Sequence, residues 1–580
     1  MSPGRPDVIV ILTDQERAAP PYETDDMHRW RGAALPGRRW FDEHGVSFDR
    51  HYTGSLACVP SRPTIFTGQF PDVHGVTQTD GLGKDADDSG MRWMRHGEVP
   101  TLGHWFRAAG YDARYEGKWH ISHVDLTDPS TGEPLATNDD AGVVDPIATQ
   151  AYLDADRLDP FGFSGWVGPE PHGGKLSNSG LRRDGLYADR AVAWLNDRYE
   201  RRRSGDTTAL RPFLLVVSFV NPHDIVLFPG WTRKSPISLS DDPYGTPDVP
   251  QPPTADDDLA DKPAAHAAYR DSYPTGYAPI GDGVYDERGD DYRRLYYRLH
   301  ADVDAPLDRV RRMVTEGGSE NAVLIRTADH GELLGAHGGL HQKWFTLYDE
   351  AVRVPFTIVR IGDRATSART IDDMVSSHVD IVPTLLAAAR IDTELIGSQL
   401  EPRFSEFHPL PGHDLMPVVD GGPAERERTI YLMTRDNIME GDTGASAVAR
   451  GFGLAADPPD DMLIEVPANV GANFEAIVTT LGGRFWKLVR TFDDPNTWTE
   501  PGVRQLATSG PGGPTHRAEV LPDEWELYDL TDDPIERHNR WNDPDAAALR
   551  AKLVQRLNDQ RRRDVPIRNV TWRYSARLSR

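Results

Sequence analysis

Three mainly apolar runs, each followed within three residues by residues of the kinds that bind ligands, constrain the fold of this chain more than any other feature. They span residues 8–12, 213–220 and 322–327. Runs of this length that are rich in Val, Ile and Leu are typical of strands buried on both faces of a parallel sheet. Helical patterns accompany them, at residues 101–109, 187–201 and 291–316. The alternation predicts a layered α/β/α domain with a large central, mostly parallel sheet.

Residues of the kinds that bind ligands stand two or three positions after each of these runs. Asp14 and Gln15 follow the first run, His223 the second, and Asp329 and His330 the third. Because ligands of open α/β sheets bind beyond the carboxyl ends of the strands, we expect these side chains to converge. Their mixed oxygen and nitrogen donors suit a divalent cation: Ca²⁺ or Mg²⁺ for the oxygens, Mn²⁺ for a site that includes nitrogen. Taken singly, an Asp after a strand is more often a helix cap or a turn residue.

Length and charge narrow the classes of protein and partner. At 580 residues the chain exceeds the size at which one hydrophobic core stops growing. A net charge of −26 argues against nucleic acid as a partner, although a cationic cleft can still bind a small anion. The sequence has no signal-peptide pattern and no apolar run of ~18 residues, so we expect a soluble cytoplasmic protein without membrane contact. The oligomeric state is left open, a homo-oligomer included.

The chain has one cysteine, Cys58, in the run Cys-Val-Pro-Ser-Arg at residues 58–62. A lone cysteine cannot close an internal disulfide, so it is either an inert buried thiol or a residue kept for its chemistry. The run continues to a Thr-Gly pair at residues 67–68. These neighbouring residues favour a chemical role for Cys58 over that of an inert buried thiol.

A Gly-Lys-x-His segment containing Lys118 and His120 follows the helical pattern that ends at residue 109. On an extended segment, side chains two residues apart lie on one face. Alone, such a pair is usually solvated. After the cysteine run we interpret it as an anion clamp with an acid/base.

Together these motifs resemble the type I sulfatases of the alkaline phosphatase superfamily. In that family Cys-x-Pro-Ser-Arg is followed shortly by Thr-Gly, and Gly-Lys-x-His is the core of a second signature. The order of the two metal-ligand pairs around these signatures is similar as well. His223, Lys343 and landmarks near residues 347–356 and 526–534 extend the resemblance over nearly the whole chain. It implies an alkaline-phosphatase-like fold and an arylsulfatase-type activity, in which the S–O bond of a small, aromatic, anionic sulfate ester is cleaved.

The resemblance also implies a cofactor and a role for each motif residue. A formylglycine-generating maturation enzyme would oxidise Cys58, the hydrate of the resulting aldehyde would be the nucleophile, and one divalent cation, Ca²⁺ before Mn²⁺ or Mg²⁺, would bind beside it. A geminal diol suits this reaction because loss of its second proton releases sulfate, whereas a sulfated serine would be hard to hydrolyse. The implied metal ligands are Asp14, Gln15, Cys58, Asp329 and His330. The implied catalytic residues are Cys58, Arg62 to steady the nucleophile, Lys118 and Lys343 on the sulfate oxygens, His223 for the leaving group, and His120 as base.

Two residues depart from the commonest sulfatase pattern, which has Asp-Asp first and Asp-Asn or Asp-Gln later. Gln15 removes one negative charge from the metal shell, and His330 replaces an amide. The pair resembles the related phosphonate monoester hydrolases and phosphodiesterases, which use the same formylglycine but do not generally keep Gly-Lys-x-His. Hydrolysis of phosphonate monoesters or phosphate diesters therefore stands as the alternative function or as a side activity. A non-catalytic anion-binding protein with a free Cys58 thiol is a third alternative.

A Pro- and Gly-rich segment at residues 408–423 marks a domain boundary. We assign residues 1–424 to the catalytic sulfatase domain and residues 425–580 to a smaller C-terminal subdomain. Short β-type runs predict a small antiparallel sheet in this subdomain, at residues 429–433, 474–481, 485–492 and 524–530. An amphipathic pattern at residues 546–563 predicts a closing helix. Residues 122–185 and 225–289 have little regular pattern and are expected either to shape the site or to form surface loops.

Overall fold

The computed structural model describes ten segments of the chain, which are residues 4–80, 86, 91–171, 175–228, 242–276, 284–362, 364–436, 470–495, 504–505 and 516–570. A seven-stranded sheet forms the centre of the molecule, with the spatial order β3-β4-β1-β5-β6-β2-β7. Its strands are β1 (Asp7–Asp14), β2 (Val46–Tyr52), β3 (Asp112–Gly117), β4 (Phe213–Pro222), β5 (Ala322–Ala328), β6 (Phe356–Ile361) and β7 (Arg369–Ser377). Only β6 runs against its neighbours, so the prediction of a mostly parallel sheet is confirmed.

The three apolar runs predicted from the sequence form β4, β1 and β5, which lie side by side. Ile9 of β1 pairs in parallel with Leu215 on one side and Leu324 on the other. Every residue of β1 is buried, because helices cover both faces of the sheet. The carboxyl ends of these strands therefore meet at one edge of the sheet.

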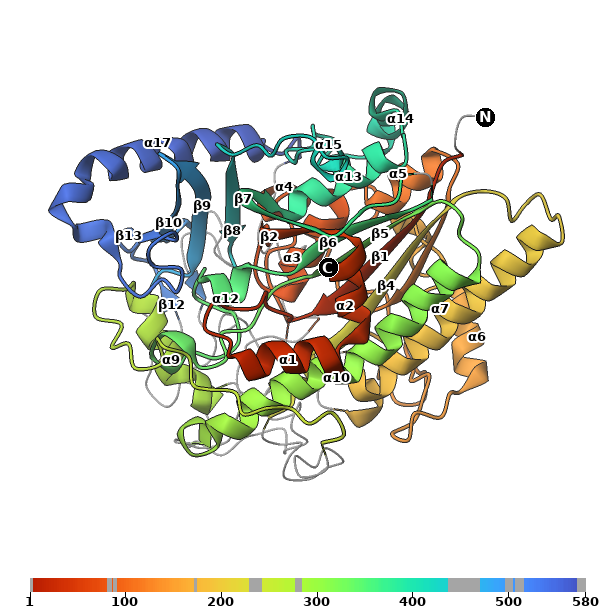
Figure 1. The fold of residues 1–580 in the computed structure, drawn as a ribbon, viewed down its shortest axis with the longest axis horizontal. Coiled ribbons are helices and arrows are strands. Elements are labelled where there is room, and N and C mark those ends of the chain that lie inside the picture. Colours follow the sequence, from red (N-terminus) through yellow and green to blue (C-terminus); the bar gives the residue numbers. More distant parts are fainter. Residues whose placement is uncertain are drawn as a thin grey trace.

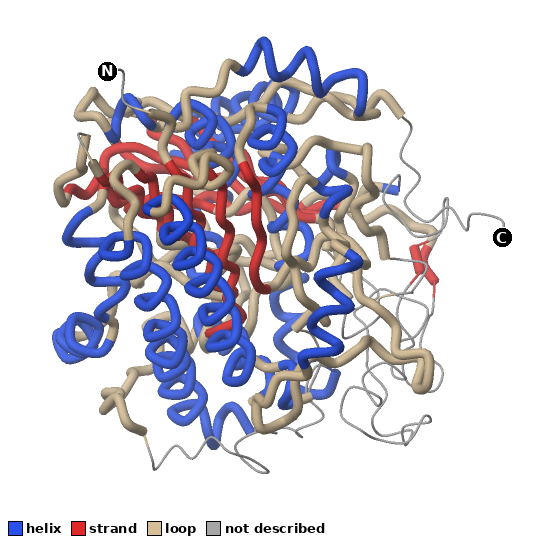
Figure 2. The backbone as a smooth tube through the Cα atoms, turned by 90° about the vertical axis from the view of Figure 1, so that its right-hand side faces the viewer, coloured by secondary structure: helices blue, strands red, loops and turns tan. Residues whose placement is uncertain are grey.

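Two layers of helices enclose the sheet (Figures 1 and 2). On one face α2 (Pro36–His44), α7 (Gly180–Arg203) and α10 (Val284–Gly317) pack on the odd residues of β1, such as Ile9. On the other face α3 (Cys58–Thr67), α5 (Leu102–Ala108) and α13 (Ile381–Ala388) pack on the even ones, such as Val8. Alternate residues of one strand thus enter two separate cores. Other α-helices in the described residues include α1 (Asp25–Ala34), α4 (Pro71–His74), α6 (Pro146–Ala155), α9 (Ala264–Gly276), α11 (Ala336–Gly339), α12 (Asp349–Val352), α14 (Thr393–Leu400) and α15 (Met416–Val419).

The predicted C-terminal antiparallel sheet is present, with the order β13-β10-β9-β8. Its strands are β8 (Thr429–Thr434), β9 (Asn473–Leu481), β10 (Arg484–Phe492) and β13 (Glu524–Asp529), and β11 (Arg504–Gln505) and β12 (His516–Arg517) form a separate pair. Gly482 and Gly483, both at positive φ, make the two-residue turn between β9 and β10. Helix α17 (Ala547–Asp564) closes this sheet through Leu553 and Leu557 (Figure 1). The fold class is therefore as predicted, whereas the domain boundary at residue 424 stays a prediction.

In their described residues, the stretches with little regular pattern contain the whole of helices α6 and α9 and the beginnings of α7 and α10. Helix α6 was missed because it buries only Ala148 and Tyr152, too few to give a periodic pattern. A capping signal was present in the sequence, where Asp145 stands directly before Pro146, the first residue of α6. In the structure Asp145 accepts hydrogen bonds from the backbone N–H groups of Ile147 and Ala148. Residues 229–241 and 277–283 of the second stretch lie outside the described residues.

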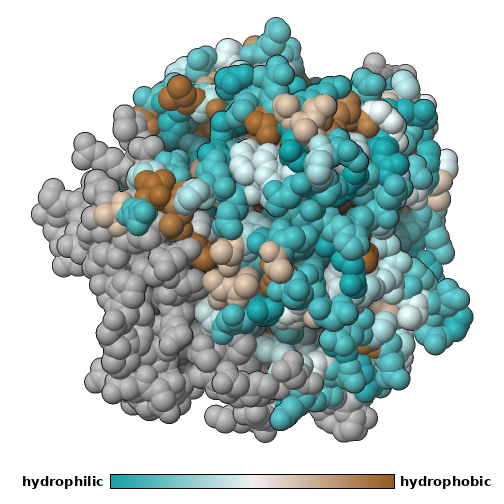
Figure 3. Space-filling model, turned by 90° about the vertical axis from the view of Figure 1, so that its left-hand side faces the viewer, coloured by the Kyte–Doolittle hydropathy of each residue, from teal (hydrophilic) through white to brown (hydrophobic). Residues whose placement is uncertain are grey.

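The surface that corresponds to the left-hand side of Figure 1 is mainly hydrophilic where it is described, with small separate hydrophobic groups (Figure 3). Such groups are normal on soluble surfaces. In the described part of the chain, no helix has both the length and the apolar composition that crossing a membrane requires.

Candidate active site

Four neighbouring strands place the predicted side chains at one edge of the central sheet. Asp14 ends β1, Lys118 follows β3, His223 follows β4, and Asp329 follows β5. Because the order is β3-β4-β1-β5 and all four strands are parallel, these residues stand in consecutive positions along that edge. The convergence expected from the sequence is therefore what the fold produces.

Cys58 begins helix α3, which follows the carboxyl end of β2. The side chain is buried with 2% of its surface exposed. Burial raises the pKa of the Cys58 thiol to about 11, although Lys118 and Lys343 act in the opposite direction. As a thiol, this residue is a poor nucleophile at neutral pH, because the reactive form is the thiolate.

Arg62, one turn into α3, connects the two carboxylates of the site. Its guanidinium donates to Asp14 Oδ2 at 2.8 Å and to Asp329 Oδ2 at 2.9 Å. It also donates to the backbone oxygen of Lys118 at 2.7 Å and to Ser218 Oγ at 2.9 Å. Arg62 is fully buried, so it fixes the ends of β1, β3, β4 and β5 relative to helix α3.

The charges of Asp14 are balanced mainly by two cations. Its Oδ2 lies 2.7 Å from Lys118 Nζ in addition to the contact with Arg62. Burial alone would raise the pKa of Asp14, but Lys118, His223 and Arg62 together hold it well below its usual value. Burial and the nearby Asp14 charge raise the pKa of Asp329 instead. A bound cation would favour the ionised form of both carboxylates.

Two buried ligand-type atoms in this cluster have no hydrogen-bond partner among the described residues. They are Asp14 Oδ1 and His330 Nε2, which lie 3.7 Å apart. His330 Nδ1 contacts the backbone oxygen of Gly331 at 2.9 Å; that oxygen can only accept, so Nδ1 carries the hydrogen and Nε2 keeps a free lone pair. Donor atoms of Asp14, Asp329 and His330 all lie within 4.8 Å of one another. Three of the five predicted metal ligands thus form a set that fits a divalent cation.

The side chain of Gln15 is oriented by residues that the sequence analysis missed. Its Nε2 donates to Glu332 Oε2 at 2.5 Å and to Gln342 Oε1 at 2.8 Å. Its Oε1 accepts a hydrogen bond from Lys343 Nζ at 2.9 Å. Glu332 Oε1 in turn accepts from the Tyr292 hydroxyl at 3.0 Å. Glu332 and Gln342 are close in sequence to His330 and Lys343, but nothing in the sequence indicated which way they point.

The Gly-Lys-x-His segment is not extended, contrary to the spacing argument. Strand β3 ends at Gly117, and His120 has a φ of 53°. A side chain at Gly117 would meet Ser218 O at 1.9 Å, which explains the glycine before Lys118. Glu170 accepts a hydrogen bond from the backbone N–H of His120 at 2.9 Å and holds the turn. Lys118 and His120 are therefore positioned by a turn and not by strand periodicity.

The two histidines of the proposed proton chemistry have different surroundings. His120 Nε2 lies 3.0 Å from Asp80 Oδ1, so a carboxylate supports its ring. His223 is partly buried, and its pKa is lowered well below the usual value, first by burial and then by Lys118, against an opposing effect of Asp14. Asp80 and Glu170 carry no motif, so sequence reasoning had no signal for either.

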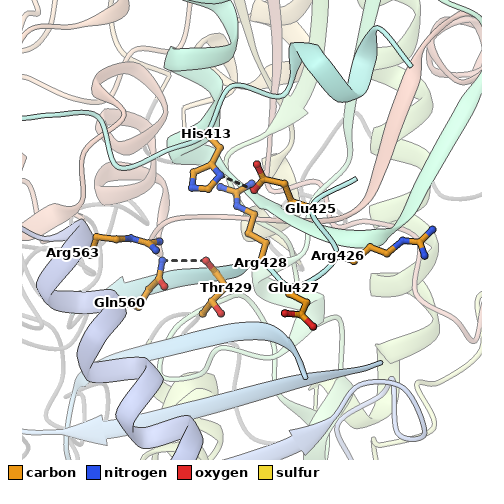
Figure 4. Close-up of a pocket in the computed structure, with 8 residues that line it drawn as sticks. All are labelled: His413, Glu425, Arg426, Glu427, Arg428, Thr429, Gln560 and Arg563. Atoms are coloured by element: carbon orange, nitrogen blue, oxygen red, sulfur yellow. Dashed lines mark hydrogen bonds and ion pairs between the residues drawn. The ribbon is translucent and has the colours of Figure 1, made fainter. Parts of the chain in front are cut away.

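A cavity of about 370 Å³ lies away from this cluster, between α17 and the start of β8 (Figure 4). In it His413 pairs with Glu425 at 2.8 Å, and Gln560 Nε2 donates to the backbone oxygen of Thr429 at 3.1 Å. None of the predicted site residues lines it. Each arginine that lines the cavity is paired with a carboxylate, Arg426 with Asp373, Arg428 with Asp380 and Arg563 with Asp564, so the cavity offers little to an anionic ester.

A family model described as Sulfatase matches residues 6–391. The chain belongs to the sulfatase family. The match covers the cysteine run, the Gly-Lys-x-His segment and both metal-ligand pairs, so the resemblance seen in the sequence is confirmed.

Among individual proteins, the uncharacterized sulfatase YidJ of Escherichia coli strain K12 is 30% identical over 366 residues, which are 60% of this chain and 61% of that protein. A 2-O GAG sulfatase has a similar structure, with a TM-score of 0.60 at 18% identity over 97% of this chain and 92% of that one. A phosphonate monoester hydrolase of Agrobacterium radiobacter gives a TM-score of 0.57 at 20% identity, over 97% and 96%. At such identities the structures show a shared fold alone. The chain spans about three fifths of the length of the first curated relatives it matches.

Proposed function

We propose that this sulfatase cleaves the S–O bond of small sulfate monoesters with a formylglycine hydrate derived from Cys58. The observation that carries the proposal is the position of Cys58: at the start of a buried helix, among Asp14, Lys118 and Lys343, with a thiol that burial keeps protonated. Such a thiol is unsuited to attack by itself. The substrate, the maturation enzyme that acts on Cys58 and the cytoplasmic location all belong to this proposal.

The chemistry of residue 58 explains why an aldehyde hydrate serves better than a thiol or a serine. A formylglycine hydrate supplies one hydroxyl that attacks sulfur and a second whose deprotonation expels sulfate and restores the aldehyde. The protein therefore needs an anion clamp, a donor for the leaving oxygen and a base. The residues around Cys58 supply one candidate for each.

Lys118 and Lys343 are the proposed clamp on the sulfate oxygens. Both are almost fully buried, so their charges act on a bound anion with little screening by water. Lys343 is held by Gln15 Oε1, and Lys118 by Asp14 Oδ2. Arg62 acts through the two carboxylates that it joins.

His223 is the proposed donor for the leaving oxygen. Its depressed pKa describes the site without substrate, and an anionic ester beside the ring favours the protonated form. His120, supported by Asp80, is the proposed base for the second hydroxyl. General acids and bases in such positions typically contribute about 10²- to 10⁴-fold in rate.

A divalent cation, Ca²⁺ in the first instance, would be held by Asp14, Asp329 and His330, with Gln15 and residue 58 as the further proposed ligands. When bound it would polarise the sulfate oxygens and neutralise the two carboxylates. The support for the cation is the unpartnered pair Asp14 Oδ1 and His330 Nε2. Oxygen donors predominate in this set, which favours Ca²⁺ or Mg²⁺ over softer ions.

Hydrolysis of phosphonate monoesters or phosphate diesters is the second candidate. The observation that favours it is the pair Gln15 and His330, which makes the metal shell less negative than two Asp pairs would. Sulfate monoesters and phosphate diesters both carry a single negative charge on a tetrahedral centre, so one cationic site can accept either.

A comparison of two substrates tests the choice between a sulfatase and a phosphonate monoester hydrolase. With fully matured enzyme, kcat/KM for 4-nitrophenyl sulfate should exceed that for 4-nitrophenyl phenylphosphonate, and a phosphonate preference of orders of magnitude would reverse our assignment.

Mass spectrometry of the peptide that contains residue 58 should show a loss of ~18 Da relative to cysteine. Only unmodified thiol in protein produced with the maturation enzyme would support the non-catalytic alternative. Cys58→Ala should abolish turnover and leave the circular dichroism spectrum unchanged.

A further inference from the structure

A carboxylate from the C-terminal sheet reaches the candidate active site and gathers hydrogen bonds from three separate segments. Asp436, two residues beyond β8, is buried with 3% of its surface exposed. Its Oδ1 accepts from the backbone N–H of Thr79 at 2.9 Å. Its Oδ2 accepts from the Thr79 hydroxyl at 2.5 Å, from the Trp344 indole at 3.2 Å and from the Ala57 backbone N–H at 3.3 Å.

Each of these partners is the chain neighbour of a residue in the site. Ala57 directly precedes Cys58 at the start of α3. Thr79 precedes Asp80, whose carboxylate lies 3.0 Å from His120 Nε2. Trp344 follows Lys343, and the Lys343 ammonium lies 4.6 Å from the centre of the indole ring.

The end of β8 is attached to the same segments by further hydrogen bonds. The Met433 backbone N–H donates to Gly54 O at 3.1 Å, and the Thr434 hydroxyl donates to Leu56 O. Gln78 Nε2 donates to Arg435 O at 2.6 Å. The position of Asp436 is thus fixed independently of the contacts that its own side chain makes.

The chemistry of the contacts requires a carboxylate. An ionised Asp only accepts hydrogen bonds, and four donors converge on its two oxygens. Asparagine has the same shape but would turn an NH₂ group toward at least one N–H or O–H donor. In a buried position such a mismatch leaves groups unsatisfied and displaces them.

We infer that Asp436 is a positioning residue, which fixes the nucleophile turn, the Asp80–His120 pair and Lys343 relative to one another. The turnover part of this inference rests on the proposed function. Reacting groups that shift by about 1 Å commonly lose ~10²-fold in rate. Asp436→Asn should therefore lower kcat for 4-nitrophenyl sulfate by ~10- to 100-fold and change KM by less than ~3-fold, because Asp436 itself contacts no substrate-binding cation.

The single cysteine supplies a readout that does not depend on turnover. In protein produced without the maturation enzyme, iodoacetamide reacts with no cysteine other than Cys58. Release of the Ala57 N–H should loosen the start of α3, so we expect Asp436→Asn to raise the alkylation rate by ~10-fold under native conditions. If wild-type enzyme fails to cleave sulfate esters, the proposed function fails while this measurement still tests the inference.

Asp72→Asn is the matched control. Asp72 is paired through both oxygens with Arg435, the residue before Asp436, at 2.6 Å each, and its side chain makes no other hydrogen bond or ion pair within the described residues. The Asp72→Asn variant should keep kcat and the alkylation rate within about twofold of wild type, since this ion pair does not involve the side chain of Asp436 or its donors. The formylglycine content of every variant is measured by mass spectrometry, so that a lower kcat caused by incomplete maturation is not attributed to displaced active-site residues.

Two donor-side variants keep the inference testable if Asp436→Asn does not fold. Thr79→Val removes the hydroxyl donor to Asp436 and Trp344→Phe removes the indole donor, and each variant should lower kcat by ~3- to 10-fold with KM nearly constant. The inference is overturned if folded Asp436→Asn keeps kcat and the alkylation rate within twofold of wild type. It is equally overturned if Asp72→Asn produces the same losses, or if both donor-side variants are indistinguishable from wild type.

Discussion

The side-chain amide of Gln15 donates a hydrogen bond to the carboxylate of Glu332 at 2.5 Å, and this contact selects which end of the amide faces the site. With Nε2 turned to Glu332, Oε1 is left to accept from Lys343 at 2.9 Å. A carboxylate at position 15 would face a second buried carboxylate at this distance. The departure of Gln15 from the commonest family pattern therefore has a local cause in Glu332.

We predict that Gln15→Glu lowers the free energy of unfolding by ~2–3 kcal/mol, because one buried donor becomes an acceptor against Glu332. The double variant Gln15→Glu with Glu332→Gln exchanges the two groups and should recover more than half of the loss. Urea denaturation in EDTA separates this effect from metal binding. Additive losses in the double variant would show that the two side chains do not interact.

Arg62→Lys should be strongly destabilising although it keeps the charge. A lysine has no fork with which to reach Asp14 and Asp329 together, and a broken buried ion pair typically costs ~3–5 kcal/mol. Arg39→Lys is the control, since the pair of Arg39 with Glu43 is about half exposed on both sides and should change stability by less than ~0.5 kcal/mol. Equal losses in the two variants, measured by urea denaturation, would contradict the bridging role of Arg62.

Removal of divalent cations should lower both turnover and stability. Adding Ca²⁺ to EDTA-treated enzyme at ~100 times its dissociation constant should raise the free energy of unfolding by ~2.7 kcal/mol. In His330→Ala this increase should shrink, because the unpartnered Nε2 is lost. The increase is measured by urea denaturation, and Ca²⁺ binding by calorimetric titration. If Ca²⁺ stabilises His330→Ala as much as it stabilises the wild type, the cation binds elsewhere.

Stability should also depend on pH through Glu526 in β13. Burial raises the pKa of Glu526 to about 7, while Tyr528 and Lys262 oppose this rise. Between pH ~4.5 and ~7 the folded protein keeps a proton that the unfolded chain has lost, so the free energy of unfolding falls as pH rises, by up to ~3 kcal/mol.

Glu526→Gln removes this proton and should gain stability relative to wild type across the same interval, with no further change above pH ~7. Urea denaturation at a series of pH values measures the difference. Glu524→Gln is the control, because Glu524 is two residues away on the same strand and is less buried. A difference between Glu526→Gln and wild type that is constant with pH would show that Glu526 titrates normally.

The sequence alone determined the central strands and the residues at their ends. Runs such as residues 8–12 are apolar on both sides because the strand is buried on both faces, so the pattern is local and readable. The cysteine run and the Gly-Lys-x-His segment are likewise contiguous. Helix α6 escaped because only two of its residues are buried.

Tertiary structure alone decided how these residues act. Glu332, Glu170, Asp80 and Asp436 belong to no motif, and the residue that each one contacts is 40 or more positions away in sequence. Hydrogen bonds are short and directional, so their partners follow from the packing of segments and not from spacing along the chain. The sequence therefore predicted residue 58 and the candidate metal ligands, whereas the fold determined how these side chains are oriented and paired, and it brought the carboxylate of Asp436 next to their chain neighbours.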